Sequence, residues 1–325
     1  MSRLVSVIIP AYQAERWITQ AVASCLAQSH RELEVLVLDD GSTDRTPELV
    51  TRIADSRVRL VRSEVNEGLD VVHNRGLALS HGDLVARLDA DDLMLPWRLE
   101  LQVAHLDAHP ELGLVGMNAI VLEPGRLARL YYRFTGRALH WVLHLHCALL
   151  HPTVTLRRAA LPPGGYPTGT RYSHDWALFL RMGRTSRLDT LARPGILYRR
   201  HAGAVGVAAL SAQAASARRV FGRYLREAFG LSLREDTIGA WLEPQTASAA
   251  EDPAEVAALA RLCRPDALDL GPAAPPWDDA GLARARRLWL YRIARMLRSS
   301  ASRGALWRHL LPLAGGGLAR LAIRG

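Results

Sequence analysis

The sequence predicts an α/β fold in which a mostly parallel central sheet is flanked by helices and followed by a C-terminal helical extension. Short β-branched runs alternate with helical patterns up to residue 92, as successive βαβ units require. Acidic residues follow two of these runs where each strand ends, at residues 39–40 and 89–92. Beyond about residue 205, alanine, arginine and leucine recur at helical spacing. We therefore expect a sheet domain over residues 1–205 and a helical extension over residues 206–325.

The first predicted unit is a strand, a helix and a second strand. Residues 4–9 form a short, β-branched run closed by Pro10, which cannot donate to a central ladder. From Glu15 to Leu26, apolar residues recur every three to four positions, which predicts a helix about four turns long. A second buried run follows at residues 34–38. This order of elements predicts a right-handed parallel crossover.

The second strand leads into Asp39 and Asp40 and then into a helix with an early proline. Residues 42–44 supply candidate N-caps for that helix. Capping does not account for Asp39 and Asp40, which would lie at the carboxyl edge of the sheet, where open α/β folds bind their ligands. Further along the chain we expect a strand at residues 58–61, a helix at residues 69–79 and a strand at residues 84–88.

Three carboxylates, Asp89, Asp91 and Asp92, end this fourth strand. Like charges at such short separation repel unless a cation lies between them, and carboxylate oxygens suit Mg2+ or Mn2+. A solvated acidic turn is the alternative interpretation when such a motif occurs alone. The sequence therefore suggests a divalent-cation site, and the motifs around it decide between this interpretation and a solvated acidic turn.

Composition limits the partners of the chain. The formal net charge is +9, from 41 Lys+Arg against 32 Asp+Glu, and every one of those cations is an arginine. Nucleic acid, an anionic membrane or a phosphorylated small molecule would each suit this charge. Cys25, Cys147 and Cys263 are too few and too scattered for a disulfide framework, which predicts a reducing, cytoplasmic compartment. No apolar run is long enough to span a bilayer.

Four short motifs in the first half of the chain resemble glycosyltransferase family 2, whose members have the GT-A fold. The resemblance covers roughly residues 3–205, and the glycine-rich motifs of dinucleotide-binding and phosphate-loop proteins are both missing. Each motif alone is weak, whereas their order and spacing together are specific. They are residues 5–12 (VSVIIPAY), 39–44 (DDGSTD), 74–76 (NRG) and 89–92 (DADD), with Pro96 downstream.

The resemblance implies transfer of a sugar from a nucleotide diphosphate, with a UDP-sugar favoured. It implies that Asp89 and Asp91, together with Asp92, hold Mn2+ or Mg2+ at the two phosphates of the donor. Such a cation neutralises the charge that develops on the leaving diphosphate. The donor contacts that the resemblance implies are Pro10, Ala11, Tyr12, Asp40, Gly68, Arg75, Asp89, Arg200 and His201.

Asp175 is the candidate catalytic base, because residues 172–181 resemble the acidic helix start of the family. A carboxylate held close to the acceptor hydroxyl needs to be only a modest proton acceptor. The family often has Glu-Asp here, whereas this chain has His174 before Asp175, a difference that bears on the choice of acceptor. The alternative role for Asp175 is that of a helix N-terminal carboxylate favoured by the macrodipole.

Two later segments also resemble the family. Residues 151–153 (HPT) are similar to a strand beside the acceptor pocket, and residues 197–201 (LYRRH) to a strand and turn that reach the donor diphosphate. The resemblance implies that Arg200 and His201 close over the donor, and the alternative is that His201 only binds a loop. Four histidines and Cys147 between residues 140 and 151 raise the alternative of a zinc site, although their spacing is not compelling.

The C-terminal third has its own pattern. Residues 220–229 have helical periodicity, and residues 243–280 carry six prolines, which predicts a loosely ordered connector with one helix near residues 256–262. From Leu282 onward, apolar residues alternate with arginines in a basic amphipathic pattern. Such a tail either makes a peripheral contact with an anionic membrane or packs on the catalytic domain as a cover.

The sequence thus predicts an inverting, metal-dependent transferase that acts on a saccharide or lipid-linked acceptor in cell-surface polysaccharide biosynthesis. We expect it in the cytoplasm or at the inner face of the cell membrane, with no nucleic acid as a partner. One alternative is a sugar-phosphate nucleotidyltransferase, although residues 10–16 lack the glycine-rich basic loop usual in such enzymes. The other is a catalytically inactive protein of the same fold that binds membrane or nucleic acid.

Overall fold

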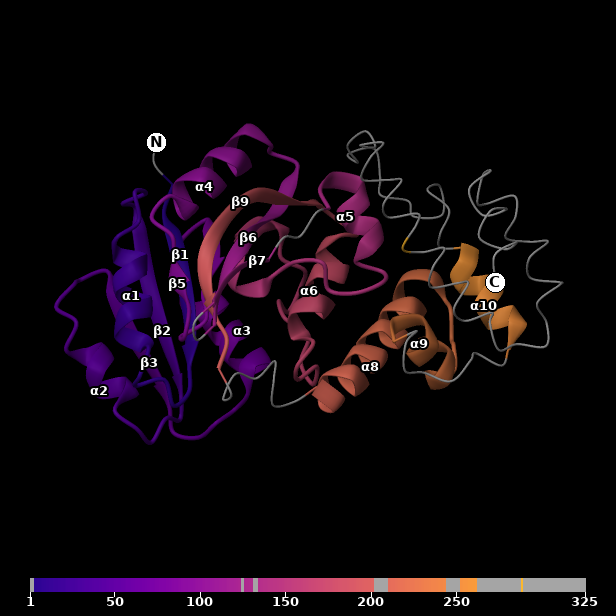
Figure 1. The fold of residues 1–325 in the computed structure, drawn as a ribbon, viewed down its shortest axis with the longest axis horizontal. Helices are drawn as coiled ribbons and strands as arrows, with labels where there is room; N and C mark the ends of the chain where they lie inside the picture. Colours follow the sequence, from indigo (N-terminus) through magenta and orange to yellow (C-terminus); the bar gives the residue numbers. More distant parts are fainter. Residues whose placement is uncertain are drawn as a thin grey trace.

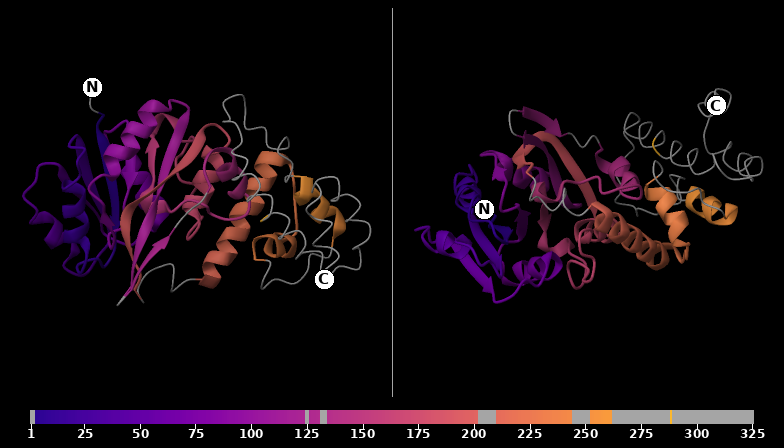
Figure 2. Two further views of the ribbon diagram at one scale, coloured as in Figure 1. Left: turned by 45° about the horizontal axis from the view of Figure 1, so that its top comes forward. Right: turned by 60° about the horizontal axis from the view of Figure 1, so that its bottom comes forward.

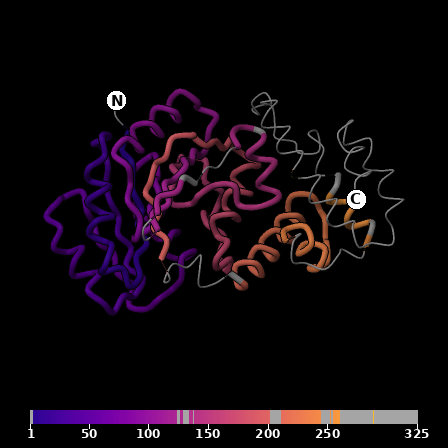
Figure 3. Tube along the Cα trace, in the orientation of Figure 1, coloured from indigo at the N-terminus to yellow at the C-terminus, as the bar shows by residue number. Residues whose placement is uncertain are grey.

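A computed structural model of the chain describes residues 3–123, 126–130, 134–201, 210–243, 252–261 and residue 288. Within these ranges, nine strands form one sheet, helices cover its two faces, and further helices follow it (Figure 1). The predicted α/β class with C-terminal helices is confirmed. The two views of Figure 2 and the trace of Figure 3 place the indigo N-terminal strands and the orange C-terminal helices at opposite ends of the molecule.

The first four strands are parallel to one another. Their spatial order is β3 (Val58–Ser63), β2 (Leu33–Asp40), β1 (Val5–Ala11) and β4 (Leu84–Arg87). Because the strands run in the same direction, their carboxyl ends meet at one edge of the sheet. This edge is where the sequence places its two groups of aspartates.

Strand β1 runs through Pro10 to Ala11, beyond the end predicted at Ile9. The carbonyl oxygen of Ile8 accepts a hydrogen bond from the Leu88 nitrogen on the β4 side, at 3.2 Å. Backbone groups of alternate residues point to the same side of a strand, so the nitrogen of Pro10 also faces that side. The pairing with β4 ends at Ile8 and Arg87, so the missing N–H of Pro10 removes no ladder bond.

The second half of the sheet is mixed. Strand β8 (Thr155–Arg157) runs antiparallel to β4, and β6 (Leu112–Glu123) runs antiparallel to β8. Strand β9 (Arg187–Arg199) is parallel to β6, and the short β5 (Leu93–Met94) pairs antiparallel with β9. Strand β7 (Arg126–Leu130) is antiparallel to β6. The pairing of β5 with β9 brings the end of β9 to the acidic segment between β4 and β5.

Different helices cover the two faces of the sheet. Helices α1 (Ile18–Leu26), α2 (Thr46–Thr51) and α4 (Arg98–Ala108) share an apolar core with the odd-numbered residues of β1. Helix α1 is shorter than the predicted four turns, and a hydrogen-bonded turn at residues 14–17 precedes it. Helices α3 (Leu69–Leu79), α5 (Gly136–Val142) and α6 (His174–Met182) belong to the second core, which includes Ile8, Leu36 and Leu38.

Helix α3 lies close to the sheet at Gly76. A Cβ atom on Gly76 would lie only 2.7 Å from Cδ1 of Leu38 and 2.9 Å from Cγ2 of Ile8, so a larger residue would push the helix outward. On its other side, the amide of Asn74 donates to the Tyr166 carbonyl and accepts from the Tyr166 nitrogen, both at 2.8 Å. The Asn-Arg-Gly motif therefore fixes α3 between the sheet and the segment that leads to α6.

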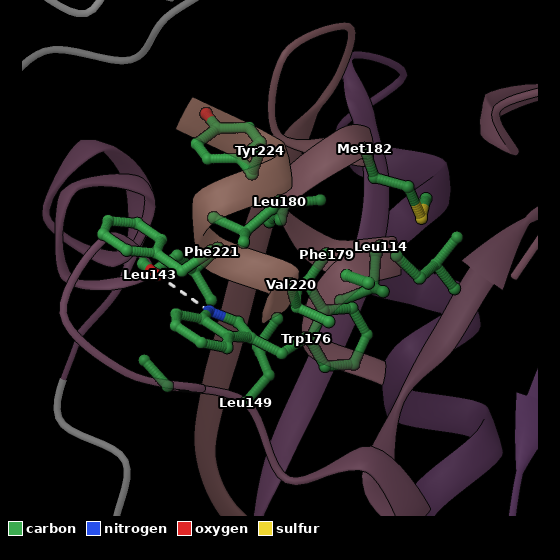
Figure 4. Packing of buried hydrophobic residues seen from close by; sticks show 14 of the residues in the cluster. Leu114, Leu143, Leu149, Trp176, Phe179, Leu180, Met182, Val220, Phe221 and Tyr224 are labelled. Atoms are coloured by element: carbon green, nitrogen blue, oxygen red, sulfur yellow. Dashed lines mark hydrogen bonds between the residues drawn. The ribbon is translucent and has the colours of Figure 1, made fainter. Parts of the chain in front are cut away.

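The C-terminal helices α8 (Leu210–Phe229), α9 (Glu235–Leu242) and α10 (Pro253–Arg261) continue this second core. Trp176 of α6 stacks on Phe221 of α8 with ring centroids 5.6 Å apart, and its Nε1 donates to the Leu143 carbonyl at 2.8 Å (Figure 4). The predicted helix at residues 220–229 is confirmed, whereas the pattern did not predict α9. The domain division at residue 205 stays a prediction.

Most of the proline-rich connector and the basic amphipathic tail lie outside the described residues, so the membrane contact predicted for the tail stays a prediction. Helix α10 falls at the helix expected near residues 256–262. Among the helices that the structure describes, none combines the length and the apolar content needed to cross a bilayer.

Candidate functional site

The carboxylates of Asp89, Asp91 and Asp92 come together immediately after β4. One oxygen from each side chain lies within 4.8 Å of an oxygen from each of the others. The backbone of this segment turns tightly, because the Asp92 nitrogen donates to the Asp89 carbonyl at 3.2 Å. The structure thus brings the three predicted ligands into a group of the size that one cation can bridge.

Two of these carboxylates already have cationic or potentially cationic partners. Oδ1 of Asp89 accepts a hydrogen bond from Nη2 of Arg87 at 2.6 Å. Oδ2 of Asp91 lies 2.9 Å from Nε2 of His201. Burial, and next the charge of Asp89, raise the pKa of Asp91, which is the response expected of a carboxylate crowded by another acid. A bound divalent cation would relieve this repulsion.

Asp92 provides the clearest indication of a missing partner. Its side chain is fully buried, and Oδ1 accepts from the Arg199 backbone nitrogen at 2.9 Å, whereas Oδ2 has no hydrogen-bond partner among the described residues. Burial and then the charges of Asp89 and Asp91 raise the pKa of Asp92 well above its ordinary value. A buried carboxylate oxygen without a partner is costly, and a hard cation such as Mn2+ or Mg2+ would satisfy it.

Arg199 and Trp17 form a wall beside the acidic cluster. Nη1 of Arg199 donates to the Asp91 carbonyl at 2.7 Å, and Nη2 donates to Gln20 at 2.5 Å. The guanidinium lies 4.6 Å from the ring centroid of Trp17, whose ring is 6.1 Å from that of His201. Neither residue was among the predicted site residues, although the period of two along β9 indicates that Arg199 and Arg200 point to opposite faces.

Arg200 is exposed, and its Nη1 pairs with Glu123 at 3.2 Å. Of the two residues expected to close over the donor, only His201 touches the acidic cluster in this structure. The donor contact of Arg200 stays a prediction that requires this surface ion pair to open.

The aspartates at the end of β2 have a different environment. Asp40 is buried, and its two oxygens accept from the backbone nitrogens of Glu67 and Gly68, at 2.8 and 3.1 Å. Oδ2 of Asp39 accepts from Nε of Arg62 at 3.2 Å. Gly68 has a φ of +95°, a conformation that favours glycine, at the N-terminus of α3. Asp40 therefore anchors this turn, and its predicted contact with the donor stays a prediction.

The remaining donor candidates lie along the same edge of the sheet. Pro10 and Ala11 are buried in the last part of β1, and Tyr12, which follows them, is 53% exposed. Arg75 of α3 forms an ion pair with Glu67, in the turn that Asp40 holds. At this edge, the exposed ring of Tyr12 and the guanidinium of Arg75 lie near the turn at Glu67 and Gly68 that Asp40 holds.

Asp175 lies in the first turn of α6 and is partly buried. The Sγ atom of Cys147 is 3.8 Å from its Oδ2. Burial, and next the negative charge of Asp175, raise the pKa of the Cys147 thiol well above its ordinary value, so this cysteine is a neutral donor. The geometry is compatible with both predicted roles of Asp175, as a base and as a helix N-terminal carboxylate.

Three buried histidines, His73, His151 and His174, also lie close enough together to hold a metal ion. Burial is the largest cause that lowers the pKa of each, so all three are neutral. The nitrogens of His73 are both engaged, Nδ1 with the Leu69 carbonyl at 2.5 Å and Nε2 with Nε of Arg87 at 2.6 Å. Because a guanidinium occupies this side of the group, the acidic cluster is the better cation site.

The group of His73, His151 and His174 lies between the acidic cluster and the start of α6. Arg87 contacts both Asp89 and His73, and the ring of His73 stacks on that of His174 with centroids 4.9 Å apart. His174 directly precedes the candidate base, Asp175. The acidic cluster and the start of α6 are therefore joined by an unbroken series of side-chain contacts.

The alternative zinc site around residues 140–151 does not come together as one group within the described residues. Of its members, His151 belongs to the group with His73 and His174, whereas His140, His144, His146 and Cys147 belong to neither of the two groups able to hold a metal. His140 accepts from the Leu188 nitrogen at 2.8 Å, and Nε2 of His144 lies 3.0 Å from the hydroxyl of Tyr224. These histidines hold α5 to β9 and to α8.

Comparison with known proteins gives consistent matches. The family model described as Glycosyl transferase family 2 matches residues 6–161. A glycosyltransferase of Haemophilus influenzae is 39% identical over 102 residues, which are 31% of this chain and 41% of that protein. The Escherichia coli protein named UDP-Glc:alpha-D-GlcNAc-diphosphoundecaprenol beta-1,3-glucosyltransferase WfgD is 28% identical over 58% of this chain and 73% of its own length. The chain thus spans less than half of the first of these relatives.

Solved structures agree on the fold. Staphylococcus aureus TarS 1–349 in complex with UDP-GlcNAc has a TM-score of 0.58 at 19% identity, over 90% of this chain and 88% of that one. The mannosyltransferase PcManGT of Pyrobaculum calidifontis, in complex with GDP-Man and Mn2+, has a TM-score of 0.53 at 21% identity, over 99% of this chain and 83% of that one. At this level of identity the likeness establishes a shared architecture.

Proposed function

Because this chain belongs to glycosyltransferase family 2, we propose that it transfers a sugar from a nucleotide diphosphate to a saccharide or lipid-linked acceptor with inversion at the anomeric carbon. A UDP-sugar is the favoured donor. The names of two similar proteins support this choice, since one uses UDP-Glc and the structure of another holds UDP-GlcNAc. The structure of a third similar protein holds GDP-Man, so donors with guanine as the nucleobase must be tested beside UDP-sugars.

The observation that carries this proposal is the acidic cluster with its unpartnered oxygen. Asp89, Asp91 and Asp92 would hold Mn2+ or Mg2+, and the buried Oδ2 of Asp92 provides a ligand atom that no group in the described part of the chain satisfies. When bound, the cation would neutralise charge on the leaving diphosphate. His201 and Arg199 lie beside the cluster, where their positive or hydrogen-bonding groups would orient the diphosphate.

Asp175 is the proposed base. It lies at the start of α6, which the Arg87, His73 and His174 contacts connect to the acidic cluster. An acceptor hydroxyl held near its carboxylate would lose its proton to Asp175 as the oxygen attacks the anomeric carbon. Positioning would supply much of the rate enhancement, since a carboxylate is a modest base at neutral pH.

The acceptor and the cellular location belong to the same proposal. The E. coli relative is named for a diphosphoundecaprenol acceptor, and Rhizobium meliloti ExoO, which is 35% identical over 39% of this chain, is named for succinoglycan biosynthesis. We therefore favour cell-surface polysaccharide biosynthesis at the inner face of the cell membrane. Pelleting with anionic vesicles tests the tail: a chain that ends at residue 280 should bind less well than the full chain.

A panel of nucleotide-sugars tests the proposed reaction. In the presence of Mn2+ and a saccharide or lipid-linked acceptor, the protein should release UDP from a UDP-sugar, and Asp91→Ala should slow this release because it weakens binding of the metal and the donor together. Calorimetry should also detect Mn2+-dependent binding of UDP. Formation of a UDP-sugar from UTP and a sugar phosphate would instead identify a nucleotidyltransferase. An inactive binding protein would show neither UDP binding nor product.

A further inference from the structure

Arg87 is a buried cation at the end of β4, with a relative exposure of only 5%. Each of its three guanidinium nitrogens donates a hydrogen bond to a different partner. Nε donates to Nε2 of His73 at 2.6 Å, Nη1 donates to the Leu88 carbonyl, and Nη2 donates to Oδ1 of Asp89 at 2.6 Å. The backbone and side-chain partners on both sides fix the position of the guanidinium, so it cannot withdraw toward solvent.

Asp89 is the anion that balances this buried charge. Among the described residues, Arg87 forms an ion pair with Asp89 and with no other carboxylate. On its opposite side lie His73, His151 and His174, whose pKa values burial and the charge of Arg87 lower, so these imidazoles are neutral and supply no countercharge to Arg87. A buried guanidinium that loses its only paired carboxylate is strongly disfavoured.

The same carboxylate is a candidate ligand of the divalent cation. Asp89 belongs to the group with Asp91 and Asp92, and its Oδ1 accepts the hydrogen bond from Nη2 of Arg87. A divalent cation at this cluster would therefore compete with Arg87 for Asp89 and would experience repulsion from a fixed positive charge beside its ligand. Neither effect arises at a cluster that contains carboxylates alone.

We propose that Arg87 is a built-in competitor of the divalent cation, which neutralises Asp89 while the cluster is empty and weakens cation binding. This inference rests on the cation site of the proposed function. It assigns Arg87 a role in setting the metal affinity, and not in ligating the metal or the donor. The consequence is a site that fills with cation only at higher concentration, or when the anionic diphosphate arrives with it.

The test compares a charge-removing and a charge-keeping variant of the full-length protein. Free Mn2+ is titrated without nucleotide and followed by electron paramagnetic resonance, in which bound Mn2+ loses the signal of the free ion. Arg87→Met keeps the length of the side chain without its charge and should bind Mn2+ about tenfold more tightly than the wild type. Arg87→Lys keeps the charge and should remain within about twofold of the wild type.

The opposite result identifies a different role. If Arg87→Met and Arg87→Lys both weaken Mn2+ binding, Arg87 positions Asp89 for the metal and the competitor role is refuted, while the cation site stands. If wild type and both variants bind no Mn2+ with or without UDP, the cation site of the proposed function fails and this inference fails with it. Arg87→Gln, which retains a donor for His73, provides a second uncharged variant should Arg87→Met fold poorly, and it should also bind Mn2+ more tightly.

Discussion

Two strands of the parallel sheet, β2 and β4, end in aspartates at the same edge, yet their carboxylates have unlike surroundings. At the end of β2, both oxygens of Asp40 accept backbone hydrogen bonds, and Asp39 pairs with Arg62. At the end of β4, Oδ2 of Asp92 is buried with no hydrogen-bond partner in the ranges that the structure describes, and two further acids crowd it. Both groups have the same residue type at the carboxyl ends of two parallel strands, which lie on either side of β1.

The difference teaches that unsatisfied hydrogen-bonding capacity distinguishes a ligand site from a structural turn. The β2 carboxylates are stabilised by protein groups, Asp39 by Arg62 and Asp40 by the backbone nitrogens of Glu67 and Gly68, so they need no cation. The β4 carboxylates repel one another, and burial raises the pKa values of Asp91 and Asp92. Substitutions at the end of β4 should therefore change mainly metal affinity, whereas substitutions at the end of β2 should change mainly the stability of the fold.

The largest effect should come from Asp175, which belongs to neither strand end. Asp175→Asn should lower turnover by about 10³-fold, because the amide cannot accept the proton of the acceptor hydroxyl. UDP and Mn2+ binding should be unchanged, since Asp175 is not part of the acidic cluster. Steady-state kinetics and calorimetry on the same preparation measure both quantities. A variant that keeps most of its turnover would leave Asp175 with the helix N-terminal role alone.

The next largest effect is a difference in Mn2+ affinity between variants at the end of β4 and variants at the end of β2. Asp91→Ala should weaken Mn2+ binding by about 100-fold, because it removes one ligand and one negative charge from the cluster. Asp40→Ala should leave Mn2+ affinity within about twofold of the wild type, since its carboxylate serves backbone amides. Mn2+ titration measures both. Equal losses in the two variants would show that the ends of β2 and β4 form one metal site.

A matched pair of isosteric changes should move stability in opposite directions. Asp40→Asn leaves one backbone N–H facing an amide NH₂ and should lower the free energy of unfolding by about 1–3 kcal/mol. Asp92→Asn keeps the Oδ1 acceptor for Arg199 and removes a crowded buried charge, so the metal-free protein should gain roughly 1 kcal/mol.

Urea denaturation without metal measures the two free energies. Destabilisation by Asp92→Asn would mean that the carboxylate is satisfied in solution by a group other than a cation. Addition of Mn2+ should stabilise the wild type and Asp40→Asn but not Asp92→Asn, because ligand binding to the folded state raises its stability.

The smallest effect concerns acid stability. Burial lowers the pKa of His144 from 6.5 to about 4, so the unfolded chain binds more protons between these values. Its contribution is fully present above pH 6.5 and is lost as the pH falls toward 4. His144→Gln should lower the pH midpoint of acid unfolding by roughly 0.3 units.

The sequence by itself determined the parallel half of the sheet and the positions of its acids. Alternating hydrophobic periods fix strand and helix order locally, and the chain direction then carries residues 39–40 and 89–92 to one edge. The helical spacing after residue 210 was likewise visible in the chain. Local sequence patterns predict the order of helices and strands because residues close together in the chain determine it.

Only the tertiary structure decided which acids are satisfied. Arg199 reaches Asp92 from a strand more than a hundred residues further along the chain, and His73 approaches Arg87 from a different helix. The sequence gives no register for such long-range contacts, because they depend on how β5 and β9 pair within the sheet and on how α3 packs against it. Hydrogen-bond satisfaction is a property of that packing, and it is what separates a structural aspartate from a candidate metal ligand.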